Sequence, residues 1–253
     1  MVSYKAAKRS FLGTREEQQD YALFKSTDSS IFAVVCDGMG GLKGGSIASS
    51  VVATELMTQY ENKEKSEPIK DFFFNTVDVL DERVCNLVDE DNKKMHAGTT
   101  LVAVCIEGNR LNWLSVGDSR LYVIRGREIV QATRDHNYNL NLNALLKSGA
   151  LSEQEYKKEK VRGESLISFI GIGGIEVMDI SQKPLPLQNG DYVLLTTDGL
   201  FKLMSDQEIK EIIITGRSVD ESADFLIEKS FKKAVKFQDN TTFVLIKIEE
   251  KEK

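Results

Sequence analysis

The stretch IFAVVCDGMGG, residues 31–41, decides how the rest of the chain is interpreted. Its apolar residues and one cysteine run directly into Asp37 and Gly38. Such a run is typical of a buried strand, and the Asp-Gly pair at its end presents an acidic side chain and an unhindered backbone carbonyl at a sheet edge. We expect a carboxylate in that place to bind a cation.

The same pattern recurs at other places in the chain. An apolar run over residues 192–197 ends in Asp198-Gly199, Asp118 lies in the turn-like sequence LSVGDSR, and Asp239-Asn240 precedes the last apolar run. A single Asp-Gly pair is ordinary turn chemistry. Several acidic residues that each adjoin a very apolar strand favour a functional site.

Carboxylates gathered from separate strand ends repel one another unless cations lie between them. The chain has only two histidines and no closely spaced cysteine pair. The available ligands are therefore oxygens, which suit Mg²⁺ or Mn²⁺ rather than Zn²⁺. Two such ions about 3.5–4 Å apart lower the pKa of a shared water enough to make a hydroxide nucleophile. The pattern predicts a hydrolytic site.

Arg15 suggests the electrophile, because it lies shortly before Asp20 in the sequence REEQQD. A guanidinium forms paired hydrogen bonds with phosphate oxygens and stays charged at any pH. Arg15 is therefore predicted to orient a phosphoester for attack. A plain surface arginine is the alternative, and the residues alone leave both open.

The composition is that of an ordinary globular protein. Of the 253 residues, 41% are hydrophobic and 28% are charged, and no apolar run is long enough to cross a membrane. We expect one large domain over residues 1–253, a cytoplasmic monomer without a secretory signal, and three reduced cysteines. The net charge of −6 disfavours a nucleic-acid-binding surface.

Strand and helix signals follow one another in runs, without a βαβ rhythm. Two helices are predicted after the opening strand, the second over residues 69–91, and hairpin-like strands cover residues 99–133. Residues 137–163 are predicted to be helical and polar, with a capping box at Ser152, and similar capping pairs begin helices at Ser205 and Ser218. The pattern indicates an α+β fold of antiparallel sheets covered by helices, with a charged lid-like insertion.

With these motifs, the chain resembles a known family, the metal-dependent type 2C protein serine/threonine phosphatases in their compact bacterial form. The motifs occur in order through nearly the whole chain: REEQQD (15–20), DGMGG (37–41), GTT (98–100), GDSR (117–120), TRDH (133–136), SGALSEQE (148–155), TTDGL (196–200) and DN (239–240). The resemblance implies a four-layer α-β-β-α sandwich of two antiparallel sheets flanked by helices. It also implies hydrolysis of phosphoserine and phosphothreonine in proteins.

The resemblance further implies a set of metal ligands. Asp37 matches the carboxylate that bridges two ions, and Gly38 matches the backbone-carbonyl ligand of the second ion. Asp198 and Asp239 match the other ligands of the first ion. Asp118, together with Asp198, matches the pair that holds a third, weaker ion in bacterial members. The expected cofactors are two Mn²⁺ or Mg²⁺ ions, with the third site in addition.

Other motifs match positions that act on the substrate. By resemblance, Arg15 holds the substrate phosphate and Asp20 acts mainly through metal-bound water. Residues 147–164 match a mobile flap beside the site. The flap motif itself comprises Ser148, Gly149, Ala150, Leu151 and Ser152.

The chain departs from the family pattern at several positions. Gln18-Gln19 stands where Asn-Glu is usual, which implies weaker binding of the second metal, and Met39 stands where many eukaryotic members have histidine. The replaced carboxylate leaves an alternative open, a pseudophosphatase or phosphoprotein-binding regulatory module without turnover. As an enzyme, the protein is expected to act on phosphoserine and phosphothreonine proteins and to oppose a bacterial serine/threonine kinase.

Overall fold

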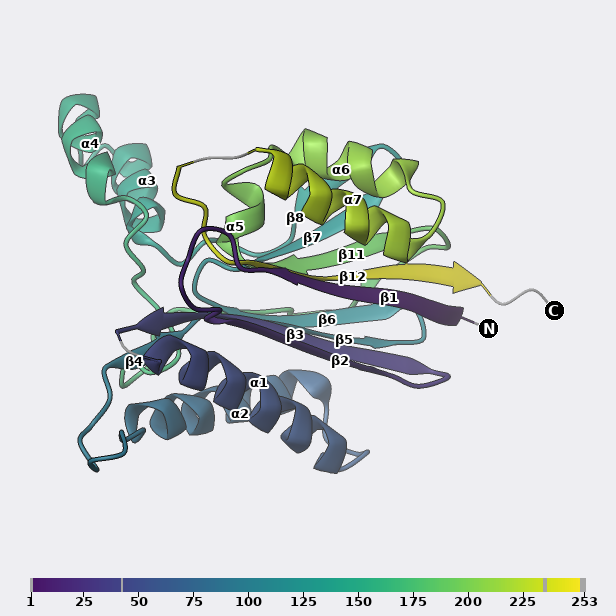
Figure 1. Ribbon diagram of the computed structural model, residues 1–253, viewed down its shortest axis with the longest axis horizontal. Coiled ribbons are helices and arrows are strands. Elements are labelled where there is room, and N and C mark those ends of the chain that lie inside the picture. Colours follow the sequence, from purple (N-terminus) through teal and green to yellow (C-terminus); the bar gives the residue numbers. More distant parts are fainter. Residues whose placement is uncertain (1, 42, 234–235, 251–253) are drawn as a thin grey trace.

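The computed structural model describes residues 2–41, 43–233 and 236–250. Two antiparallel sheets pack face to face, and helices cover the outer face of each sheet (Figure 1). The arrangement is the predicted four-layer α-β-β-α sandwich. Both chain ends lie at one end of the sandwich, and a pair of helices projects from the opposite end (Figure 1).

The first sheet has five strands in the order β1-β12-β11-β7-β8, all paired antiparallel. The strands are β1 (Val2–Phe11), β12 (Thr241–Glu250), β11 (Tyr192–Thr196), β7 (Arg120–Arg125) and β8 (Glu128–Gln131). The two longest strands of this sheet, β1 and β12, come from opposite ends of the chain. The pairing between them joins the first and last strands side by side.

The second sheet follows the order β10-β6-β5-β3-β2, with β4 added to β3 and β9 added to β6. The strands are β2 (Asp20–Ser26), β3 (Ser30–Gly40), β4 (Ala97–Thr99), β5 (Leu101–Glu107), β6 (Arg110–Val116), β9 (Asp179–Ile180) and β10 (Leu185–Pro186). Strand β3 lies inside this sheet, where it pairs with β2 on one side and with β5 on the other.

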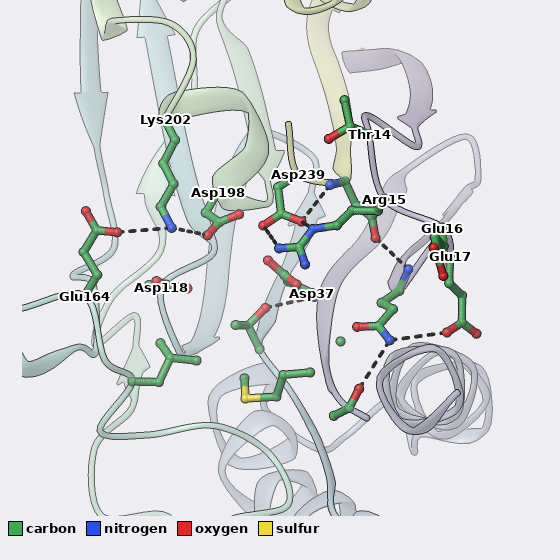
Figure 2. A pocket seen from close by; sticks show the side chains of 17 residues that line it. Thr14, Arg15, Glu16, Glu17, Asp37, Asp118, Glu164, Asp198, Lys202 and Asp239 are labelled. Carbon is green, nitrogen blue, oxygen red and sulfur yellow. Dashed lines mark hydrogen bonds and ion pairs between the residues drawn. The ribbon is translucent and has the colours of Figure 1, made fainter. Parts of the chain in front are cut away.

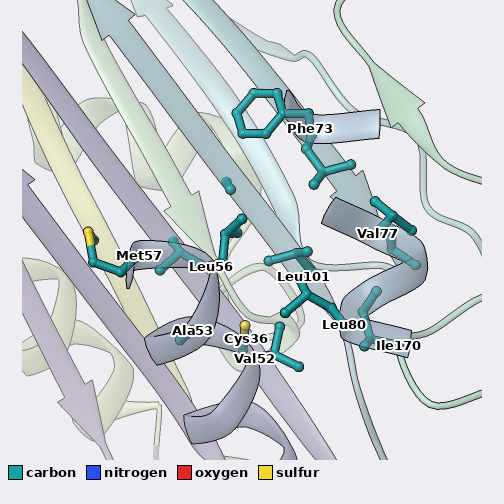
Figure 3. Close-up of a cluster of buried hydrophobic side chains, with 14 of the residues drawn as sticks. Cys36, Val52, Ala53, Leu56, Met57, Phe73, Val77, Leu80, Leu101 and Ile170 are labelled. Carbon is teal, nitrogen blue, oxygen red and sulfur yellow. The ribbon is translucent and has the colours of Figure 1, made fainter. Parts of the chain in front are cut away.

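The apolar run that opened the sequence analysis is buried on both faces because its side chains alternate between two cores. Ile31, Ala33 and Val35 face the other sheet, in the core between the two sheets. Phe32 and Cys36 face the helices on the outside, in a cluster that Figure 3 shows. A strand with apolar layers on both sides has apolar residues at consecutive positions, and β3 shows this pattern.

Helices cover both sheets. The helices on the second sheet are α1 (Gly44–Asn62) and α2 (Ile69–Cys85), and those on the first are α5 (Asp198–Phe201), α6 (Asp206–Thr215) and α7 (Val219–Lys232). The projecting pair is α3 (Tyr138–Ser148) and α4 (Glu153–Glu159), continued by a 3₁₀ turn over Lys160–Arg162. No helix in the described ranges has the length and apolar character needed to cross a membrane.

Three helix starts are confirmed and one helix end is corrected. The Ser152, Ser205 and Ser218 hydroxyls cap α4, α6 and α7, as predicted. The helix predicted over residues 69–91 ends at Cys85. Beyond it the chain makes a tight turn, because the Asp89 carboxylate accepts hydrogen bonds from two backbone N–H groups and Asn92 adopts a left-handed conformation.

Candidate active site

An open cavity of about 740 Å³ lies at the end of the sandwich away from the termini. Four of the predicted aspartates line it (Figure 2), and each comes from a different part of the fold. They are Asp37 in β3, Asp118 in the turn between β6 and β7, Asp198 at the start of α5, and Asp239 just before β12. The sandwich therefore gathers at one place acids that are far apart in sequence.

Asp20 and Asp37 are direct partners in the ladder between β2 and β3. The Asp20 carboxylate is buried and accepts a hydrogen bond from the Thr197 hydroxyl at 2.9 Å. The backbone of Asp37 is held by the GTT motif. Its carbonyl accepts from the Thr99 hydroxyl at 2.9 Å, and its N–H donates to the Thr100 hydroxyl oxygen at 3.0 Å. Both acids are thus held by threonines from other parts of the fold.

Gly38 must be a glycine because the first turn of α1 lies directly against it. A Cβ atom built on Gly38 would stand 2.1 Å from the carbonyl oxygen of Gly45 and 2.5 Å from that of Gln19. The Gly38 N–H also donates to the Gln19 carbonyl at 3.1 Å. Only a residue without a side chain allows α1, the turn before β2 and the end of β3 to meet here.

Arg15 lies at the cavity and forms a paired hydrogen bond with Asp239. Its Nε donates to Asp239 Oδ1 at 2.8 Å and its Nη2 to Oδ2 at 2.7 Å. Both side chains remain well exposed. The arginine predicted to hold a phosphate therefore lies beside a predicted metal ligand, in a geometry that presents its fork of donors to two oxygens of one group (Figure 2).

Asp198 is held by a cation that sequence reasoning missed. Lys202 Nζ donates to Asp198 Oδ2 at 2.6 Å and lies 3.3 Å from Glu164 Oε2. The sequence carries a weak signal for the first contact, because Lys202 lies four positions after Asp198, a spacing that brings side chains together on a helix; no helix was predicted there, and the structure shows that α5 begins at Asp198. The sequence carries none for Glu164, which comes from the segment after α4.

Burial and mutual repulsion raise the carboxyl pKa values of Asp20, Asp37 and Asp118. Burial raises the pKa of Asp37 well above its usual value, and the other four carboxylates add to the shift. Burial also raises the pKa of Asp20 to about 7, although hydrogen bonding to Thr197 opposes the change. Burial and then repulsion by Asp198 raise the pKa of Asp118 to about 7. This group of acids is short of positive charge.

The residues present fit a hard divalent cation. Within the described ranges, no three His, Cys, Asp or Glu side chains stand arranged to hold a metal ion, and Arg15 and Lys202 each hold one carboxylate of the group. Yet Asp20 Oδ1 and Asp198 Oδ1 are buried and have no hydrogen-bond partner among the described residues. Unpartnered buried oxygens in an all-oxygen donor set are what Mg²⁺ or Mn²⁺ would satisfy.

The predicted flap motif lies in the connection between α3 and α4. Ser148 is the last residue of α3, Gly149 ends that helix in a left-handed conformation, and Ser152 caps α4. Figure 1 shows that α3 and α4 project at the same end of the sandwich as β4, away from the chain termini. Of the predicted segment, Glu164 lines the cavity.

Comparison with known proteins identifies a family that matches most of the chain. The model of the family described as protein phosphatase 2C matches residues 9–236. The chain is 27% identical over 241 residues to the protein phosphatase PhpP of Streptococcus pneumoniae, and the match covers 94% of each chain. It is 26% identical over 227 residues to the serine/threonine phosphatase stp of Listeria monocytogenes, with 88% of this chain and 87% of the relative covered.

Solved structures agree as well. The serine/threonine phosphatase of S. agalactiae superposes with a TM-score of 0.83 at 26% identity, over 97% of this chain and 99% of that one. The catalytic domain of the phosphatase PstP, solved in complex with two manganese ions, superposes with a TM-score of 0.76 at 26% identity, over 99% and 100% of the two chains. The family model, which matches residues 9–236, and the shared fold together show that the chain belongs to the protein phosphatase 2C family.

Proposed function

We propose that the protein is a metal-dependent protein serine/threonine phosphatase. Water adds to phosphorus, the bond between phosphorus and the ester oxygen breaks, and the serine or threonine oxygen leaves with a proton. The observation that supports this best is the meeting of Asp37, Asp118, Asp198 and Asp239 around one cavity with Arg15 beside them. All family matches described above are to protein phosphatases, which makes phosphoproteins the substrate class.

Two divalent ions would be held by Asp37, the Gly38 carbonyl, Asp198 and Asp239. Mn²⁺ is preferred over Mg²⁺ in this proposal because the similar PstP domain was solved with two manganese ions. When bound, such ions polarise a phosphoryl oxygen and lower the pKa of water into the range where hydroxide forms at neutral pH.

Arg15 and Asp20 have roles of their own in the proposal. The Arg15 fork already binds two oxygens of the Asp239 carboxylate, and the same fork matches two oxygens of a phosphoryl group. Asp20 is held by Thr197 through Oδ2, and its Oδ1 has no partner among the described residues. That oxygen is available to accept a hydrogen bond from a water in the site and so to orient it.

Residues 1–253 are proposed to form one phosphatase domain, with residues 147–164 inserted as a flap beside the cavity. The projection of α3 and α4 from the sandwich supports this division (Figure 1), and so does the cavity contact of Glu164. A cognate serine/threonine kinase would supply the phosphoproteins. A cytoplasmic location suits an enzyme that opposes such a kinase.

Hydrolysis of para-nitrophenyl phosphate by the purified protein tests the function. We expect turnover with Mn²⁺, loss of turnover with EDTA, and a loss of about a hundredfold or more in Asp198→Ala, because even residues that merely support metal ligands contribute 10–100-fold. Asp220→Ala is the matched control, since this carboxylate is exposed beside Arg9 and lies outside the cavity.

Full activity in Asp198→Ala would contradict the proposal. Calorimetric titration with Mn²⁺ separates the enzyme from a phosphoprotein-binding module. A catalyst of this kind must bind the ion, whereas a module without turnover need not.

A further inference from the structure

Lys202 occupies a special position between the cavity and the segment that follows α4. It directly follows α5 (Asp198–Phe201), so its side chain returns along the helix to the first residue of that helix. Figure 2 shows the ammonium between the carboxylates of Asp198 and Glu164, with Asp118 nearby. The distances from Nζ are 2.6 Å to Asp198 Oδ2 and 3.3 Å to Glu164 Oε2.

The two oxygens of Asp198 have different surroundings. Oδ2 accepts the Lys202 hydrogen bond, whereas Oδ1 is buried and has no hydrogen-bond partner among the described residues. One oxygen of this carboxylate is thus available for a metal ion in the main site. The other oxygen, which would serve a further ion shared with Asp118, is already neutralised by the chain itself.

A lysine side chain carries a positive charge at neutral pH. The Lys202 ammonium is bonded to Asp198 and lies near Asp118 (Figure 2). It therefore acts electrostatically on both acids that the family resemblance assigns to a third ion.

We propose that the Lys202 ammonium takes the place of a third metal ion at Asp118 and Asp198, so that this phosphatase works with two divalent ions. The inference rests on the proposed function. A divalent ion placed between these two acids would be repelled by the ammonium and would compete with it for Asp198 Oδ2. Lys202 is a positioning residue in this proposal, because it acts on the reaction only through Asp198 and Asp118.

The number of Mn²⁺ ions bound per chain tests the proposal. Calorimetric titration of the full chain is expected to give two ions for the wild type and three for Lys202→Met, with the third site at least tenfold tighter than any third site of the wild type. Lys202→Arg keeps the positive charge and is expected to return the number to two. In Lys202→Met/Asp118→Asn, the new site loses a ligand and the number again falls to two.

Glu164→Gln is a matched control, because it removes the outer partner of Lys202 and leaves the contact with Asp198 in place. It is expected to bind two ions. The Lys202 side chain is 44% exposed, so these variants should fold, and Lys202→Gln provides a second neutral replacement should Lys202→Met fail to do so.

The outcomes separate the two proposals. Three tightly bound ions in the wild type, or equal numbers in wild type and both neutral variants, would overturn the role of Lys202 while leaving phosphatase activity intact. A wild type that binds no Mn²⁺ and hydrolyses no phosphoester would instead overturn the proposed function, and the role of Lys202 with it.

Discussion

Replacing Asp81 should loosen the active site from a distance. Asp81 is a buried residue of α2, and its carboxylate accepts backbone hydrogen bonds from Gly171 at 2.6 Å, Gly173 at 3.1 Å and Gly174 at 2.7 Å. All three glycines have positive φ, between 87° and 127°, where residues with side chains would be strained. The carboxylate therefore determines the conformation of a loop that has few other constraints.

This loop connects to the acids of the cavity through the pairing of Ile170 with Thr99. Ile170 pairs with Thr99, its N–H donating to the Thr99 carbonyl at 2.9 Å and its carbonyl accepting from the Thr99 N–H at 3.0 Å. The Thr99 hydroxyl in turn donates to the Asp37 carbonyl. Asp81 in the helix layer thus supports Asp37 through Ile170 and Thr99.

The expected loss of stability on replacing Asp81 follows from the three hydrogen bonds that its carboxylate accepts. Each bond to a charged acceptor contributes about 1.5–3 kcal/mol, but Gly173 and Gly174 are exposed, so water can replace part of what they lose. In Asp81→Asn the remaining side-chain oxygen can still accept a hydrogen bond. The NH₂ group that replaces the second oxygen is itself a donor, so at least one backbone N–H loses its acceptor. We expect the free energy of unfolding to fall by about 2–4 kcal/mol.

Urea unfolding gives the measurement, with the midpoint lowered and the m value unchanged. Activity toward para-nitrophenyl phosphate should fall as well, because Asp37 loses support. Asp78→Asn is the matched control on the exposed face of the same helix, with an expected change within about 0.5 kcal/mol. Equal stability of Asp81→Asn and wild type would refute the reasoning.

Two further predictions concern Arg15 and Asp179. Arg15→Lys keeps the charge but loses the paired hydrogen bonds, so kcat/KM should fall about 10–100-fold, mainly through KM. An unchanged KM for a phosphothreonine peptide would argue against phosphate binding by this residue. Burial favours the neutral form of Asp179, but His136, whose Nε2 lies 3.5 Å from Asp179 Oδ1, and the hydrogen bonds from Arg134 outweigh this effect and lower the pKa of Asp179. The ionised form therefore stabilises the fold fully above the unfolded value of about 4, and this contribution is lost as the pH falls below it. The stability difference between wild type and Asp179→Asn should accordingly shrink between pH 6 and about pH 3 in urea titrations, and a constant difference would contradict the assignment.

The features that the sequence predicted correctly depend on interactions between near neighbours. The capping serines at 152, 205 and 218 each bond to a backbone N–H three residues on, and the apolar run of β3 belongs to a single strand that is buried on both faces. The helix predicted to continue to residue 91 was wrong at its end because the turn stabilised by Asp89 competes with the last helical turns. Competition between the end of a helix and a turn leaves only a weak signal in the spacing of apolar residues.

The candidate site shows the same difference between local features, which the sequence predicts, and contacts between residues far apart in the chain. Acidic residues after apolar runs could be recognised from the sequence, because a strand end and a turn are local features. The side chains that contact those acids could not be recognised from the sequence. Arg15 and Asp239 are 224 positions apart, and the Asp81 carboxylate meets glycines 90 or more positions away.

By itself, the sequence determined the layers, the capped helices and the set of acids that could bind metal. Only the tertiary structure decided which cation stands beside each acid. Lys202 reaches Asp198 because α5 begins at that residue, and it meets Glu164 because the chain after α4 returns to the cavity. Such contacts depend on how the two sheets and their connections pack, and packing between distant segments leaves no period or spacing in the sequence.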